Sequence, residues 1–240
     1  MKQNETLSNI RLNGDKIVFT DDELMEEMGD NHISTSVDTP MVPGSFDKSD
    51  EEKIAIIQDH FKAIMETLGL DLSDDSLKGT PKRVAKMYVK EIFSGLNPAN
   101  KPSVALFDNK YKYNEMLVEK NISFYSNCEH HFVPIIGKAH LAYISNGRVI
   151  GLSKLNRLVE FYAKRPQVQE RLTMQIAKEL QKELGTEDVA IVIDAKHLCV
   201  ASRGVEDDTS STITSFYGGK FKEEKRKEEF LRYLELKTEF

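Results

Sequence analysis

The chain has 240 residues and a formal net charge of −6, with 40% hydrophobic and 8% aromatic residues, a composition typical of a globular protein. It has no apolar run of eighteen residues, and its start, M-K-Q-N-E-T-L, lacks the basic-then-apolar order of a signal peptide. We therefore expect a cytoplasmic protein that does not bind or cross a membrane. Its two cysteines are too few for a disulfide framework, which leaves metal binding, catalysis or simple burial as their role.

The acidic charge is concentrated at the N-terminus. Residues 1–46 hold nine acidic and three basic side chains, which accounts for the whole net charge, so residues 47–240 are balanced. The opening is poor in periodic apolar positions, and we predict a mostly disordered extension over 1–46 with a short helix near 21–28. The balanced body argues against nucleic-acid binding, which would need a basic excess.

A helical region is predicted for residues 47–114. Its first helix opens on acidic residues, carries apolar side chains at helical spacing and ends at Gly69. The second helix has Thr80 as candidate cap and Pro81 at its first position, and we expect Gly95 to stop it.

The remaining segment, 115–240, is predicted to form a second domain of strands and helices. Two strand-like stretches lead to an Asn-Gly turn at 146–147, and a helix follows with Ser153 as candidate cap. We expect Pro166 to open a second helix that ends at Gly185. Two more strands are expected in D-V-A-I-V-I-D-A-K-H-L-C-V and S-T-I-T-S-F-Y. The resulting ββααββ order predicts an α+β fold with an antiparallel sheet.

Each cysteine has a histidine nearby. Cys128 lies in C-E-H-H, where a strand turns, so it could reach one point together with His131, while His197 and Cys199 would share one face of a strand. Zinc prefers thiolate and imidazole, and three protein ligands leave the fourth position open for water, as in catalytic sites. His130 or His197 could supply a fourth ligand, so spacing alone leaves a catalytic site, a structural site and simple burial open.

These residues suggest a chemistry. A bound Zn²⁺ would lower the pKa of its water to about 7, which favours hydrolysis. The histidines not used as ligands, His130 and His197, would suit proton transfer, although each could also be merely buried or support a ligand. Five cations could bind a polyphosphate, or each could be an ordinary surface charge; they are Arg83, Lys86, Lys154, Arg157 and Arg203.

Five segments together resemble the GTP cyclohydrolase I family, which begins pterin synthesis. They are C-E-H-H-F, V-I-G-L-S-K-L-N-R-L-V, R-P-Q-V-Q-E-R-L-T, H-L-C-V-A-S-R-G-V and the T-P-K-R-V-A-K-M helix, and they run in the family's order from about residue 50 to the C-terminus. The resemblance implies the tunnelling fold (T-fold), a four-stranded antiparallel sheet with two helices on one face. It also implies a homo-oligomer, typically a decamer of two pentamers, with active sites at subunit boundaries.

The resemblance further implies a reaction and a set of site residues. Zinc-activated water would attack C8 of guanine, the ring would open and release formate, and the ribose would rearrange and close to give 7,8-dihydroneopterin triphosphate, the first step of tetrahydrofolate and pterin biosynthesis. One Zn²⁺ per subunit is implied. The implied metal ligands are Cys128, His131 and Cys199; the catalytic residues are His130, His197 and Ser153; and the residues that recognise guanine are Gln169 and Glu170. Those that contact the triphosphate or ribose are Ser153, Lys154, Arg157 and Arg203, together with Arg83 and Lys86 from across the subunit boundary. The resemblance makes residues 115–240 a T-fold catalytic domain.

Two competing interpretations stay open. A structural zinc module would need a closed four-ligand site and no turnover. Another T-fold enzyme that acts on a related purine or pterin is nearer, although the nitrile-reducing relatives use a nucleophilic cysteine without zinc. Zinc nucleobase deaminases do not fit, since the sequence lacks H-x-E followed by P-C-x-x-C.

Overall fold

The computed structural model describes residues 36–237, and Val37–Phe240 belong to one compact unit. The helix predicted near 21–28 and most of the predicted disordered extension lie outside the described residues. Residues 36–49 form turns and bends without a helix or strand.

The first described helix is α2, Asp50–Thr67. Ser49 caps it, since its hydroxyl accepts from the Glu52 backbone while the Glu52 carboxylate accepts from the Ser49 backbone. The chain leaves the helix before Gly69, whose φ of +81° is left-handed, as predicted. The expected apolar face is only partly buried, because Ile54 is covered whereas Ile64 is 52% exposed.

Helix α3, Thr80–Met87, begins at the predicted place, but Gly79 and not Thr80 is its N-cap. The prediction that it continues to Gly95 is wrong. The chain passes into a π-helical turn and two short 3₁₀ turns; these are η1 (Tyr88–Ile92), η2 (Ser94–Leu96) and η3 (Pro98–Asn100).

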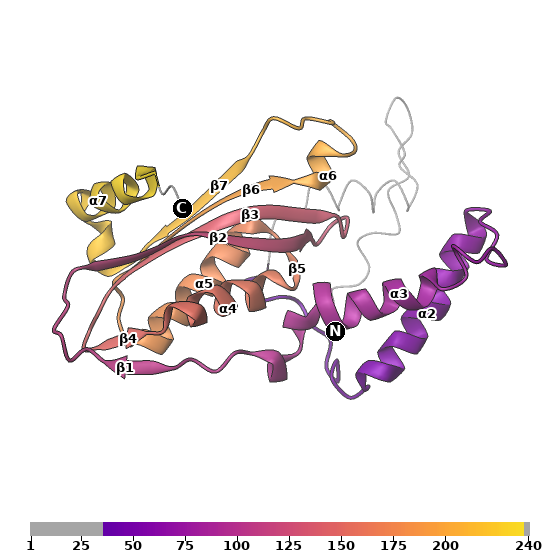
Figure 1. The fold of residues 1–240 in the computed structure, drawn as a ribbon, viewed down its shortest axis with the longest axis horizontal. Coiled ribbons are helices and arrows are strands. Elements are labelled where there is room, and N and C mark those ends of the chain that lie inside the picture. The colour runs from indigo at the N-terminus through magenta and orange to yellow at the C-terminus, as the bar shows by residue number, and fades with distance from the viewer. Residues whose placement is uncertain (1–35, 238–240) are drawn as a thin grey trace, which may run out of the picture. The chain divides into compact units, whose positions relative to one another are not determined.

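The centre of the structure is a five-stranded sheet with the order β5-β2-β3-β6-β7 (Figure 1). All neighbours are antiparallel except β5, which runs parallel to β2. The strands are β2 (Met116–Cys128), β3 (Pro134–Ile144), β5 (Pro166–Gln167), β6 (Val189–His197) and β7 (Thr212–Tyr217). A separate two-stranded ladder joins β1 (Leu106–Asp108) to β4 (Arg148–Ile150).

Helices α4 (Leu152–Ala163) and α5 (Gln169–Leu184) pack on one face of this sheet (Figure 1). Side chains alternate along β6, so that Ile191 and Ile193 join the core under the helices. Helix α5 carries a buried apolar stripe at helical spacing: Leu172, Ile176, Leu180 and Leu184 are all at most 3% exposed. Gly185 ends this helix in the left-handed conformation, as expected.

The opposite face of the sheet is covered at one end. Phe221 in the short turn η4 (Gly219–Lys222) and Phe230 in α7 (Glu224–Glu235) are fully buried and pack against Met116, Ala142 and Val192. Farther along this face Tyr125 is 60% exposed and Ile136 41% exposed. Part of this face around Tyr125 and Ile136 therefore stays open in a single chain.

The ββααββ order and the antiparallel sheet confirm the predicted T-fold. Two local predictions were wrong. Ser153 does not cap α4, because the helix already starts at Leu152 with Gly151 as its N-cap. Pro166 does not open α5, because it pairs with Asn127 in β5, and the helix begins only after the extended residue Val168.

Candidate metal centre and substrate residues

The C-E-H-H segment forms a tight turn at the end of β2. The amide of Phe132 donates to the Cys128 carbonyl over 2.8 Å, and the Asn127 side chain donates to the Phe132 carbonyl over 3.0 Å. Phe132 has a φ of +54°, a left-handed conformation that is uncommon for a bulky residue. The turn is also joined to β5, since the Glu129 amide donates to the Gln167 carbonyl over 3.1 Å.

Cys199 reaches the site from a short helix and not from a strand, so the prediction that His197 and Cys199 share a strand face is wrong. Strand β6 ends at His197, and residues Leu198–Ala201 form α6. His197 pairs with Ile135, so the next ladder position would face Pro134, which has no N–H to donate. The ladder therefore stops there.

The structure nevertheless brings together the three predicted metal ligands. One donor atom from each of Cys128, His131 and Cys199 lies within 4.8 Å of the others. Cys128 is buried, Cys199 half-buried and His131 exposed, so the group is open on one side. Two sulfurs and one imidazole nitrogen form a donor set that suits zinc.

The electrostatics of the two thiols also fit a cation. Burial, and then the neighbouring Cys128, raises the pKa of Cys199 to about 11, while the Arg203 guanidinium opposes this shift. A metal ion would reverse this preference, because a coordinated thiol is deprotonated.

Of the two histidines predicted to move protons, His130 contacts this group and His197 precedes Cys199 by two residues. Nδ1 of His130 is 3.7 Å from Cys128 Sγ, and its Nε2 is 3.8 Å from a carboxylate oxygen of Glu129. Nε2 of His197 is 2.8 Å from Oε1 of Gln169. Burial lowers the pKa of His197, and the nearby Glu170 carboxylate acts in the opposite direction.

Gln169 and Glu170, at the start of α5, have different surroundings. The Gln169 side chain is buried, and its amide nitrogen donates to the carbonyls of Ile193 and Thr212 and to the hydroxyl of Thr214. This pattern orients Oε1 of Gln169 toward His197, which then donates through Nε2–H. Glu170 is exposed, so its carboxylate is accessible to a ligand.

Ser153, Lys154 and Arg157 lie toward the amino end of α4, away from their own chain's metal group. The carboxyl end of α4 leads into β5, which pairs with Cys128. Ser153 is ten residues before Ala163, which corresponds to about 15 Å along a helix. The amino end of α4, which holds Ser153 and Lys154, is therefore separated by most of the helix from the strand that pairs with Cys128.

Arg83 and Lys86 are exposed on α3. The Arg83 guanidinium donates to the Ser76 carbonyl and the Thr80 hydroxyl, both over 3.1 Å. The segment after α3 approaches the C-E-H-H turn, where the rings of Phe93 and Phe132 lie 5.0 Å apart in an edge-on arrangement.

Glu129 and Arg171 were not predicted as site residues, although their side chains meet at the C-E-H-H turn. Arg171 donates to both carboxylate oxygens of Glu129. Glu129 stands between two predicted ligands in the sequence, and Arg171 directly precedes the apolar stripe of α5. A charged residue at the edge of such a stripe is a weak signal of a buried pair.

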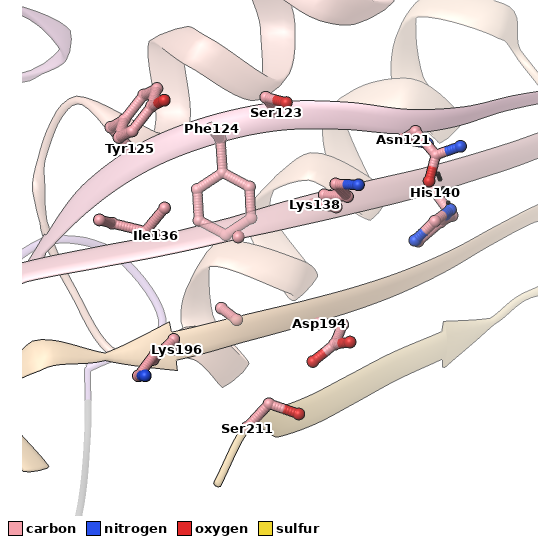
Figure 2. A pocket seen from close by; sticks show the side chains of 12 residues that line it. Asn121, Ser123, Phe124, Tyr125, Ile136, Lys138, His140, Asp194, Lys196 and Ser211 are labelled. Carbon is pink, nitrogen blue, oxygen red and sulfur yellow. Dashed lines mark hydrogen bonds between the residues drawn. The ribbon is translucent and has the colours of Figure 1, made fainter. Parts of the chain in front are cut away.

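Apart from the metal group, a pocket lies on the face of the sheet that α4 and α5 do not cover (Figure 2). It has a volume of about 640 Å³, and Lys138, His140 and Asp194 are among the residues that line it. None of the predicted site residues lines this pocket.

No helix within residues 36–237 has the length and apolar character needed to span a membrane.

Comparisons with known proteins agree with the geometry. A family model described as GTP cyclohydrolase I matches residues 57–235. A protein named GTP cyclohydrolase 1 from Flavobacterium johnsoniae is 64% identical over 223 residues, which cover 93% of this chain and 100% of that relative. Proteins of the same name from Aeromonas hydrophila and Citrobacter koseri are 58% identical (78% of this chain, 84% of the relative) and 52% identical (83% and 90%). The chain belongs to the GTP cyclohydrolase I family.

Proposed function

We propose that this protein hydrolyses GTP to 7,8-dihydroneopterin triphosphate and formate. The observation that carries the proposal is the convergence of Cys128, His131 and Cys199 within 4.8 Å, in a chain of this family. The reaction would begin tetrahydrofolate and pterin biosynthesis, and we place it in the cytoplasm.

The metal would be one Zn²⁺ per chain, held by Cys128, His131 and Cys199. When bound, zinc would supply hydroxide near neutral pH by lowering the pKa of a coordinated water to about 7. Three protein ligands favour a catalytic over a structural site, because structural zinc sites are closed by four. The alternative fourth ligand His197 is already engaged with Gln169 through Nε2.

His130 and His197 would move protons during ring opening and closure. Each imidazole has a partner that orients it, Glu129 for His130 and Gln169 for His197, and His130 also lies 3.7 Å from Cys128 Sγ. Histidine suits this role because its usual pKa is near the working pH. Ser153 would assist the rearrangement of the ribose.

Guanine would be recognised by Gln169 and Glu170. The exposed Glu170 carboxylate can accept hydrogen bonds from N1–H and the 2-amino group of guanine, which adenine does not offer. Gln169, which is buried and directly precedes Glu170, would form the second member of the guanine-recognising pair. Cations would contact the triphosphate or ribose; these are Lys154, Arg157, Arg203, Arg83 and Lys86.

The complete site would form between subunits of a homo-oligomer, which we expect to be a decamer. Lys154 and Arg157 lie toward the far end of α4 from their own chain's metal group, so a neighbouring chain would supply them. The sheet also has edges that can pair: among the described residues, β5 covers the outer edge of β2 only at Asn127 and Cys128. Natural proteins rarely leave such a long edge uncovered.

The test is to incubate metal-assayed protein with GTP and to measure formate together with the fluorescent oxidised pterin. We expect both products, with about one metal ion per chain. Formate alone would indicate a hydrolase that stops before ring closure. Neither product from zinc-loaded protein would contradict the proposal and favour a T-fold enzyme with another substrate.

A variant at one metal ligand distinguishes loss of metal binding from loss of folding. Cys199→Ser removes one ligand from a short helix at the edge of the sheet, so the protein should fold normally but lose both its metal and formate release. An active, metal-free variant would refute the zinc assignment. Ser202→Ala, which changes a neighbouring hydroxyl bound to the Leu198 carbonyl, serves as the matched control and should keep its metal.

A further inference from the structure

A buried ion pair connects the C-E-H-H turn to α5. Arg171 is 4% exposed, although it is charged. Its Nη1 contacts Oε2 of Glu129, and its Nη2 donates to Oε1 over 3.2 Å. A two-point contact of this kind fixes the orientation of the carboxylate as well as its position.

The position of the Glu129 carboxylate affects the residues on either side of it. Glu129 lies directly between Cys128 and His130 in the sequence, and its Oε1 is 3.8 Å from Nε2 of His130. The other nitrogen of that imidazole is 3.7 Å from Cys128 Sγ. The carboxylate therefore lies between the guanidinium of Arg171 and the imidazole of His130.

The turn needs such support from outside. Phe132 adopts a left-handed conformation (φ +54°), and conformations of this kind in bulky residues persist only where the surroundings impose them. Within the turn, Asn127 binds the Phe132 carbonyl. Arg171 adds a bond from a helix whose apolar stripe is packed in the core, so the turn is tied to the core of the fold.

We propose that Arg171 is a positioning residue that acts through Glu129. By fixing the Glu129 carboxylate, it holds the turn so that Cys128 and His131 meet Cys199, and it orients His130. The proposal rests on the proposed function only for its turnover readout, because the placement of the metal ligands can be measured without substrate.

The experiment is a double-mutant cycle that uses Co²⁺ as a probe of the Cys–His–Cys group. The affinity for Co²⁺ and the absorption bands of the bound ion would be measured for the wild type, Arg171→Met, Glu129→Gln and the double variant. Each single variant should bind about 10- to 100-fold more weakly with altered bands, as is typical when a partner of a metal ligand is lost. The double variant should be no weaker than the weaker single variant, because both changes break the same link.

Turnover gives a second readout. With the metal site saturated, we expect a lower kcat and a nearly unchanged KM for Arg171→Met, since the affected group is His130 and not the guanine-binding residues. Arg171→Lys keeps the charge without the two-point contact, so its Co²⁺ affinity should fall between those of the wild type and Arg171→Met. Wild-type affinity in Arg171→Lys would refute the role of the two-point contact, even if Arg171→Met fails to fold.

Two controls distinguish positioning from general stability. Arg226→Met removes an ion pair with Glu229 on α7 and should leave Co²⁺ binding unchanged. Leu180→Ala opens a cavity on the same helix as Arg171, where Leu180 is fully buried. The proposal is refuted if Leu180→Ala weakens Co²⁺ binding as much as Arg171→Met does. It is also refuted if the losses of affinity in Arg171→Met and Glu129→Gln add in the double variant. A wild type that binds Co²⁺ but does not convert GTP would refute the proposed function and leave this inference intact.

Discussion

His140, on β3, accepts a hydrogen bond from an irregular part of the neighbouring strand β2. Its Nδ1 accepts a hydrogen bond from the backbone N–H of Asn121 over 3.3 Å (Figure 2). Asn121 lies in the bulge of β2, with a φ of +62°. Bulges leave a residue outside the regular ladder, and here the imidazole satisfies the amide that the ladder does not. The bond requires Nδ1 without a proton.

This geometry predicts that acid weakens the fold at the bulge. Burial lowers the pKa of His140, Lys138 on β3 and Lys120 on β2 lower it further, and Asp194 on β6 opposes them. The folded state therefore disfavours the proton. This contribution to stability is present above 6.5, the usual pKa of histidine, and is lost as the pH falls from there through the lower pKa of the folded state.

The measurement compares urea midpoints of the wild type and His140→Asn from pH 8 to pH 5. Asparagine keeps an acceptor near the Nδ1 position but does not titrate, so the wild type should lose stability relative to the variant on the acidic side. Parallel pH profiles would contradict the prediction, because they would show that protonation of His140 does not change the stability of the fold.

The site residues that could be predicted from the sequence were those of infrequent types. Cys128, His131 and Cys199 stood out because cysteine and histidine are few in this chain and zinc selects them. Glu129 and Arg171 did not, because charged residues are common and nothing local indicates that two of them, 42 positions apart, form a buried pair. Long-range ion pairs depend on how the helix packs on the sheet.

Among the elements, the connection after α3 shows a glycine with an unexpected role. The α-helix does not run to Gly95, which instead lies in η2 against the end of α4. Its amide donates to the Lys164 carbonyl over 2.9 Å, and a Cβ would lie 2.0 Å from the Phe161 carbonyl oxygen. Glycine is required here because two backbones meet, and not because a helix stops.

Gly95→Ala should therefore destabilise the protein by about 1–3 kcal/mol, the usual cost of overpacking, since backbone has to move. Gly151→Ala is the matched control, because its Cβ would meet no atom closer than 3.6 Å; as the N-cap of α4 it should cost at most about 1 kcal/mol. The free energy of unfolding in urea gives both values. Equal losses in the two variants would mean that the close approach at Gly95 relaxes freely.

Long, regular elements were predictable and short ones were not. The apolar residues of α5 repeat at helical spacing over the whole helix, and β6 is a long apolar segment. In both, the local sequence and the tertiary packing favour the same conformation. The two residues of β5 and the four of α6 carry no period. Their conformation depends on a partner, Asn127 opposite Pro166 for β5 and the end of the β3 ladder at Pro134 for α6.

For the whole molecule, one chain presents two incomplete halves of the proposed site. The metal group, His130 and His197 lie at one end of the sheet, whereas Lys154 and Arg157 lie toward the opposite end of α4. The outer edge of β2 and the outer edge of β7 are available at the two sides of the sheet. Pairing between unlike edges is head-to-tail, and such contacts close into rings when the rotation allows.

A shared site predicts that two inactive variants restore each other. Cys199→Ser lacks the metal half and Lys154→Ala lacks a cation of the other half, so each alone should have little activity. In mixed oligomers formed from equal amounts, about one quarter of the boundaries would combine the intact half of each chain, and activity should return to about that fraction of the wild type. Formate release measures it, and differently tagged chains confirm that mixing has occurred. Cys199→Ser mixed with Cys128→Ser is the control, because both changes damage the same half and no intact site can form. Mixed oligomers of Cys199→Ser and Lys154→Ala that stay inactive would show that each site is built within one chain.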